Sequence, residues 1–180
     1  MVTWSDIQRW SSEAFEPTLN SLADARNDIM RAKDELESSD VGQNWRGAAA
    51  NAAAAKRRQL IDDCESQIAN IEELTAATRD AQRGTREVVM MAHQAEAMAD
   101  HYGFAIADSG QVTDTPGGLA AAGLGGPQAL NPLTNPHGPA LVAERAKNMQ
   151  ETQGMVKHAI QKANAVDNNY AAALEKASQV

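Results

Sequence analysis

The chain has 180 residues, a length that fits one domain, and we treat residues 1–180 as a single helical domain. Hydrophobic residues make up 43% of it but aromatic residues only 4%, and much of the hydrophobic content is alanine, which favours narrow seams between helices over a thick core. The formal net charge of −8 argues against a nucleic-acid partner, because neutralising phosphates requires clustered Lys and Arg.

The first predicted helix spans residues 12–38. Ser11 or Ser12 is a suitable N-cap, and Pro17 is tolerated because it lies close to the first turn. Apolar residues then recur at steps of three and four, which predicts one buried stripe made of Phe15, Leu19, Leu22, Ala25, Ile29, Ala32 and Leu36.

A turn separates this helix from the second, which we predict over residues 45–101. Gly42 suits a chain reversal, Asn44 is a possible cap, and the tripeptide Trp45-Arg46-Gly47 follows. The second helix carries a continuous stripe of Ile61, Cys64, Ile68, Ile71, Thr75, Thr78, Ala81, Thr85, Val88, Ala92, Ala95 and Ala99. It would be about 80 Å long against about 40 Å for the first helix, so the first helix covers only half of it.

The third helix, predicted over residues 140–178, supplies the missing cover. A seven-residue repeat of Val142, Met149, Val156, Ala163, Tyr170 and Ala177 defines its inner face, and a second row contains Ala146, Gln153, Ile160, Val166 and Leu174. The expected fold is therefore all-α, an elongated helical hairpin with a third long helix packed along the rest of the second.

Between the second and third helices the composition changes. Residues 104–113 have the pattern of a small β-hairpin, which is stable only when it packs on another element. Residues 115–139 contain nearly all of the prolines and many glycines, which predicts a mobile loop. A phosphate-binding loop is the alternative for Gly123-Leu124-Gly125-Gly126, but no Lys follows it.

Few residues suggest chemistry. Cys64 lies on the apolar stripe, where a buried thiol is expected rather than a nucleophile, since no histidine is near it in sequence. His93, Glu96 and Asp100 share one helix face, for which we weigh a solvated polar surface against a metal site and favour the former. We therefore predict no catalytic residues, no metal, no cofactor and no small-molecule substrate, and hence no enzyme.

The Trp45-Arg46-Gly47 turn between two helices resembles the WxG family of type VII (ESX) secretion proteins of Actinobacteria and related Gram-positive bacteria. Five features extend the resemblance over nearly the whole chain, and together they are similar to the N-terminal domain of larger actinobacterial proteins that continue into a toxin or hydrolase-like domain. These features are the opening residues 4–10, the Trp45 turn, the hairpin, the Gly/Pro loop and the closing residues 163–167.

The resemblance implies a targeting and partner-binding domain that is exported by a membrane ATPase-driven machine to the medium or the cell envelope without a cleaved signal peptide. In the family, the Trp-x-Gly turn lies near a Tyr-x-x-x-Asp/Glu motif, and the two form a composite export signal. Trp45 and Gly47 carry over directly, whereas Tyr170 is followed four residues later by Leu174, with the carboxylate of Glu175 one position late. On a helix that offset turns the side chain by about 100°.

Three alternatives remain for this departure. Glu175 serves in spite of the offset, or a partner supplies the second half of the signal, or the machine does not read this chain. The partner implied is a WxG-like protein or another copy of the chain. The alternative function is a cytoplasmic helical scaffold or chaperone that binds partner helices and is not exported, and a third hypothesis places a catalytic domain after Val180. For Trp45 and Tyr170, filling gaps between helices is the competing structural role.

Overall fold

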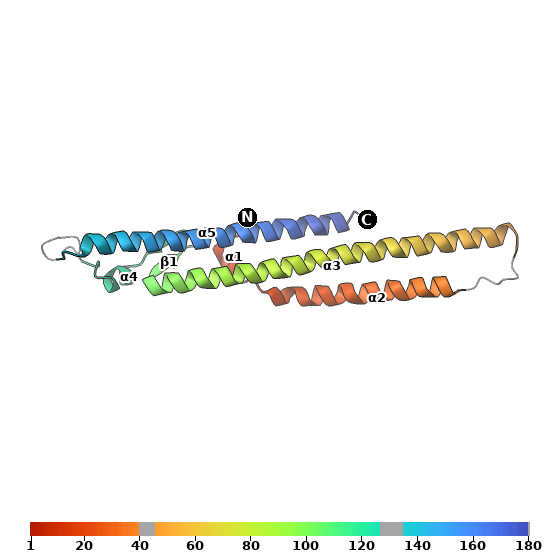
Figure 1. Ribbon diagram of the computed structural model, residues 1–180, viewed down its shortest axis with the longest axis horizontal. Helices are drawn as coiled ribbons and strands as arrows, with labels where there is room; N and C mark the ends of the chain where they lie inside the picture. Colours follow the sequence, from red (N-terminus) through yellow and green to blue (C-terminus); the bar gives the residue numbers. More distant parts are fainter. Residues whose placement is uncertain (40–45, 127–134, 180) are drawn as a thin grey trace. The chain divides into compact units, whose positions relative to one another are not determined.

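The computed structural model describes residues 1–39, 46–126 and 135–179 and is all-α apart from one small sheet (Figure 1). Its elements in chain order are α1 (Trp4–Gln8), a 3-10 turn (Ser12–Phe15), α2 (Glu16–Ser38), α3 (Ala48–Tyr102), β1 (Phe104–Ile106), β2 (Val112–Asp114), α4 (Pro116–Ala121) and α5 (Gly138–Ala177). Among the described residues, no helix combines the length and the apolar character needed to cross a membrane.

The three predicted long helices and the hairpin are confirmed. The predicted start of the first helix at residue 12 is a 3-10 turn, and α2 begins only at Glu16, with Pro17 in its first turn as expected. The predicted loop 115–139 is wrong in part, because α4 occupies its beginning: Thr115 caps this helix by accepting a hydrogen bond from the Gly118 N–H. The turn predicted at residues 40–44, and Trp45 itself, lie outside the described residues.

The chain divides into two compact units. Unit 1 contains Met1–Ser12 and Arg83–Asn168, and unit 2 contains Glu13–Gln82 and Asn169–Val180. The boundary therefore passes through α3 and again through α5.

Unit 1 has a closed core built from the second half of α3, most of α5, the hairpin and α1. Its buried hydrophobic residues are Trp4, Ile7, Val88, Ala92, Ala95, Ala99, Phe104, Val112, Val156, Ala159 and Ala163. The helices approach closely because the contact residues are small: a Cβ added to Gly84 of α3 would lie 2.5 Å from Val166 of α5. The stripe predicted for this part of α3 is confirmed.

The helix α1 is a five-residue segment that the sequence pattern did not reveal. Its N-cap Thr3 and Asp6 exchange hydrogen bonds in a capping box, and Trp4 and Ile7 are 2% and 1% exposed. The Trp4 N–H donates to the Asp108 carbonyl at 2.9 Å, and the Ser5 N–H donates to the Asp108 carboxylate at 3.0 Å. So short a helix is not stable alone in water, and the docking of its two large side chains holds it in place.

Arg145 fixes the hairpin to α5. Its guanidinium forms an ion pair with Asp114 at 2.6 Å, donates to the Tyr102 carbonyl at 2.8 Å and lies 4.6 Å from the centre of the Phe104 ring. The predicted heptad is wrong at this end of the helix, since Val142 is 40% exposed while Arg145 is only 8% exposed. At this end of α5, the side chain that packs on the hairpin is Arg145, three residues after Val142.

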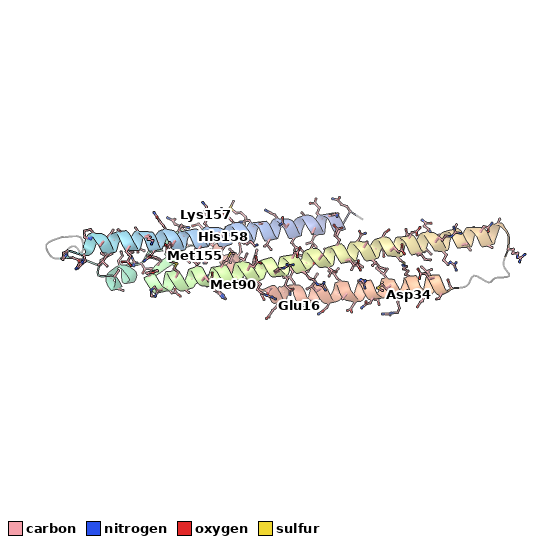
Figure 2. The ribbon with its side chains drawn as sticks, viewed as in Figure 1. Glu16, Asp34, Met90, Met155, Lys157 and His158 are labelled. Atoms are coloured by element: carbon pink, nitrogen blue, oxygen red, sulfur yellow. The ribbon has the colours of Figure 1, made fainter. Side chains whose placement is uncertain are left out.

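In unit 2, α2 lies antiparallel to the middle of α3, and the start of α3 extends beyond the end of α2 (Figure 1). Gln82 donates to Glu16, labelled in Figure 2, at 2.6 Å. Arg26 pairs with Glu72 at 2.7 Å and Lys33 pairs with Glu65 at 2.6 Å. From one pair to the next, the residue number on α2 rises by as much as the number on α3 falls. The three pairs therefore define a single antiparallel register.

The seam between α2 and α3 is thin. None of the residues of α2, all of which are described, is buried. The predicted positions Leu19, Leu22, Ile29 and Leu36 are half-buried as expected, but Ala25 and Ala32 are exposed, so the prediction is wrong for these two alanines. Arg26 and Lys33 are half-buried in their place because Glu72 and Glu65 attract them across the seam.

Candidate export signal and partner-binding surface

Gly47 occupies the position just before α3 and has the backbone conformation that glycine favours. Its φ is 110°, and its carbonyl accepts the Asn51 N–H at 3.1 Å, which begins the hydrogen bonding of α3. A residue with a side chain is strained at this φ. A Cβ placed there would meet no atom within 4 Å, so the requirement for glycine comes from the backbone rather than from a neighbour.

Tyr170 is held inside unit 2. Its ring packs edge-to-face on Phe15 with centroids 5.6 Å apart, and its hydroxyl lies 3.4 Å from Thr78 Oγ1. The residue is half-buried, as the heptad predicts, and both contacts are consistent with the gap-filling role considered for it.

Glu175 is exposed, and Leu174, predicted to lie in the inner row, is also exposed at 44%. The heptad prediction is wrong at Leu174 because α5 meets α3 through other residues here: Lys176 forms an ion pair with Glu73. The side chains of Ala173 and Ala177 line a shallow hollow on the same side.

Gly47, the described glycine of the Trp-x-Gly turn, is distant from the other two predicted residues, Tyr170 and Glu175. The Lys176–Glu73 pair places the end of α5 beside residue 73 of α3, whereas Gly47 precedes the first residue of that helix. The twenty-six residues between them correspond to about 39 Å of helix. Gly47 therefore lies far from Tyr170 and Glu175 within unit 2.

Beyond the end of α5, a strip of apolar side chains along α2 and α3 has no cover from the described residues. We call this surface the open seam and define it by Ala25, Ile29, Ala32 and Leu36 of α2 with Leu60, Cys64 and Ile71 of α3. The two alanines are exposed and Leu60 is 38% exposed. Cys64, predicted to be buried, is only half-buried.

The open seam lies on the side of the α2–α3 pair that α5 occupies elsewhere. The ion pairs Arg26–Glu72 and Lys33–Glu65 close the opposite side. Phe15 contacts Tyr170 of α5 and so marks the side of α2 that faces α5. Steps of three and four residues from Phe15 reach Ala25 and Ala32, which therefore lie toward the same side. Sequence reasoning listed these alanines as core and did not include Leu60. The available signal was the spacing of Glu65 and Glu72 on α3, which matches that of Arg26 and Lys33 on α2. Opposite charges at matching steps indicate that Arg26 and Lys33, rather than the preceding alanines, face α3.

Polar residues considered for other chemistry are not gathered into a site. Glu96 accepts a hydrogen bond from Gln8 at 2.7 Å, and His93 and Asp100 are exposed. Within the described ranges, no group of three or more His, Cys, Asp or Glu side chains is placed to hold a metal ion. Comparison with protein-family models, with curated proteins and with solved structures found no match.

Proposed function

We propose that the chain is a non-enzymatic substrate of a type VII secretion machine, or the N-terminal targeting and partner-binding domain of one. The observation that carries the proposal is the Trp-x-Gly tripeptide between α2 and α3, with Gly47 at a φ of 110°. Gly47 follows Trp45 by two residues in the sequence and is exposed between two helices, and exposed connecting segments of this kind are common places for recognition by another protein.

The open seam supports the partner-binding half of the proposal. A strip of exposed alanines and half-buried apolar residues, with a leucine that is 38% exposed, is a surface that an amphipathic helix can cover. A scaffold that binds helices inside the cell would use the same surface, so the seam alone does not separate the two functions.

The separation of Gly47 from Tyr170 and Glu175 bears on how the signal is assembled. Because about 39 Å of helix lies between residues 47 and 73, one copy of unit 2 does not form the composite signal by itself. We therefore favour the alternative in which another chain supplies the Tyr and carboxylate beside the Trp-x-Gly turn.

Export from an actinobacterial host with and without its type VII ATPase tests the proposal. The tagged wild-type chain is expected in the medium or the envelope only when the ATPase is present, and Gly47→Arg is expected to stay inside. Gly123→Arg is the matched control, since Gly123 also has a positive φ, 74°, and open space around its Cβ position, but lies in unit 1.

Circular dichroism of both variants establishes that the helices are intact. A wild-type chain that stays inside in both hosts overturns the export proposal and favours the intracellular scaffold. Equal export of Gly47→Arg and Gly123→Arg would show that the Trp-x-Gly turn is not the element that the machine reads.

A further inference from the structure

The outer edge of strand β1 carries backbone groups that have no hydrogen-bond partner among the described residues. Within the hairpin, the Ala107 N–H donates to the Gln111 carbonyl at 2.8 Å, and such bonded positions recur at every second residue of an antiparallel pair. The register of the two strands therefore turns the N–H and carbonyl groups of Phe104 and Ile106 away from β2. An edge of this kind is a template on which a further strand can form.

The edge of β2, by comparison, is covered. Gln153 of α5 accepts a hydrogen bond from the outward-facing Val112 N–H at 2.9 Å and donates to the Gly110 carbonyl at 2.8 Å. The side-chain amide of Gln153 thus takes the place of a neighbouring strand. The described residues provide no equivalent for β1, so β1 is the edge at which the sheet can grow.

An open hollow of about 360 Å³, the size of a small ligand-binding cleft, lies beside this edge. Its lining contains every residue of β1 and none of β2, which sets it on the outer side of β1. Trp4 and Ala99 contribute to its apolar lining, and Glu96 and Asp100 contribute carboxylates. Glu96 is half-buried and accepts a hydrogen bond from Gln8, whereas Asp100 is exposed. No Lys or Arg of the described ranges lines the hollow, which is therefore complementary to positive charge.

We propose that an extended segment of a partner protein adds to β1 as a third, antiparallel strand and directs two basic side chains into the hollow toward Glu96 and Asp100. The inference goes beyond the proposed function, because it concerns unit 1 rather than the open seam and holds whether or not the chain is exported. A second copy of the chain is a poor occupant of this edge, since pairing two β1 strands would bring carboxylates of like charge together.

The spacing of the two carboxylates fits a strand. Glu96 and Asp100 are four residues apart on one face of α3, which corresponds to about 6 Å along the helix. Alternate residues of an extended strand are about 6.6 Å apart and point to the same side. Arg145 and Gln153 of α5 hold successive parts of the hairpin, so β1 runs along the helices rather than across them. A strand with basic residues at alternate positions therefore matches both carboxylates.

The faces of β1 determine which residues of the added strand are the basic ones. Phe104 is buried and Ile106 is half-buried, whereas Ala105 between them is exposed. Residues paired with Phe104 and Ile106 would point to the same side as these two, toward the hollow, and the residue between them would point to solvent. The same two residues would also exchange hydrogen bonds with β1, because the free backbone groups belong to Phe104 and Ile106.

Nuclear magnetic resonance of the full chain, titrated with the capped peptide Ser-Thr-Lys-Val-Lys-Thr-Ser, tests the proposal. The amide resonances of Phe104 and Ile106 are expected to shift until they saturate, and that of Ala105, which faces β2, is expected to shift less. The same peptide with Glu in place of both Lys residues is the charge control and is expected not to bind. Absence of shifts at Phe104 and Ile106, or equal binding of the two peptides, overturns the proposal.

Backbone methylation distinguishes an added strand from a simple charge contact. Methylating the backbone nitrogens of both Lys residues removes the N–H groups that would donate to β1, and binding is expected to be lost. Methylating the Val nitrogen between them leaves those donors in place, and binding is expected to persist. Equal affinity of the two methylated peptides would rule out strand addition, as would identical shifts produced by N-acetyl-lysine amide.

Variants of the hollow test its charge. The double variant with Glu96→Gln and Asp100→Asn is expected to weaken binding of the Lys peptide about fivefold, and high salt should weaken binding to the wild-type chain in the same direction. Glu144→Gln is the matched control, since Glu144 is an exposed acid of α5 that does not line the hollow. Equal affinity of the double variant and the control contradicts the proposal. Shifts at Phe104 and Ile106 that depend on protein concentration alone would assign the edge to a second copy and overturn it.

Discussion

The two units use the same alanine-rich helices to different ends. Unit 1 closes its core with large side chains from outside the long helices, namely Trp4 and Ile7 of α1 and Phe104 of the hairpin, each at most 5% exposed. In unit 2, the described large side chain from outside the long helices is Phe15, which is only half-buried against Tyr170, and no residue of α2 is buried. The comparison indicates that two helices with small contact residues bury those residues only where a third element covers them. In our proposal, the uncovered seam of unit 2 is where a partner binds.

Removing Trp4 is expected to break this comparison most strongly. Trp4→Ala deletes a side chain that is 2% exposed and should lower the free energy of unfolding by about 3–5 kcal/mol through the cavity that it leaves. Urea denaturation measures the loss. Trp10→Ala removes the same side chain at a half-buried position and should cost less. Equal losses would mean that α1 does not close the core.

The next largest effect is expected at Arg145. Arg145→Met leaves the Asp114 carboxylate and the Tyr102 carbonyl without their donor and should destabilise unit 1 by about 2–3 kcal/mol, also measured with urea. Arg145→Lys should recover only part of this, because an ammonium cannot serve both acceptors in the same planar geometry. Full recovery by Lys would reduce the role of Arg145 to its charge.

A matching deletion in unit 2 should cost less than either. Ile29 is half-buried, and we expect Ile29→Ala to lower the unfolding free energy by about 1–2 kcal/mol, since part of the site is already open to water. Thermal or urea unfolding followed by circular dichroism measures this change. A loss as large as that of Trp4→Ala would show that the seam is as well covered as the core of unit 1.

The smallest effect concerns pH. The backbone and side-chain hydrogen bonds of Thr3 lower the pKa of Asp6 below its ordinary value of 3.8, and hydrogen bonds from Ser5 lower the pKa of Asp108 in the same way. A lowered pKa stabilises the fold at pH values above the ordinary one, and this contribution is lost as the pH falls below 3.8 through the folded value.

We therefore expect α1 to loosen as the pH falls below 3.8, observed as lower protection factors for the amides of residues 4–8, each calculated against the intrinsic exchange rate at the same pH. Asp6→Asn should weaken the pH dependence of these protection factors, and the part that remains is expected to come from Asp108. Unchanged exchange in the wild-type chain at low pH would argue that the buried side chains, rather than the cap, hold α1.

Much of this architecture was predictable because it depends on helical periodicity. The stripe of α3 from Ile61 to Ala99 lies on the half-buried or buried face throughout. The burial of alanine was predicted least well: Ala92 and Ala95 are buried, while Ala25 and Ala32 are exposed. The methyl group is small, so the packing of larger neighbouring side chains decides whether an alanine is buried. Periodicity alone does not distinguish these cases.

Contacts between distant parts of the sequence were not predictable. Arg145 is buried because Asp114, thirty-one residues away, needs a partner, and no local pattern contains that information. The helix α1 has only five residues, too few to show a helical period. For the candidate site, the sequence indicated the Trp-x-Gly turn and Tyr170, but their separation became evident only from the register between α3 and α5.

Hydrogen–deuterium exchange of the full chain tests most directly whether the two units differ in how well their seams are closed. We predict slow exchange in residues 83–102 of α3 and faster exchange in α2 and residues 48–71 of α3. Equal protection in both regions would contradict this difference.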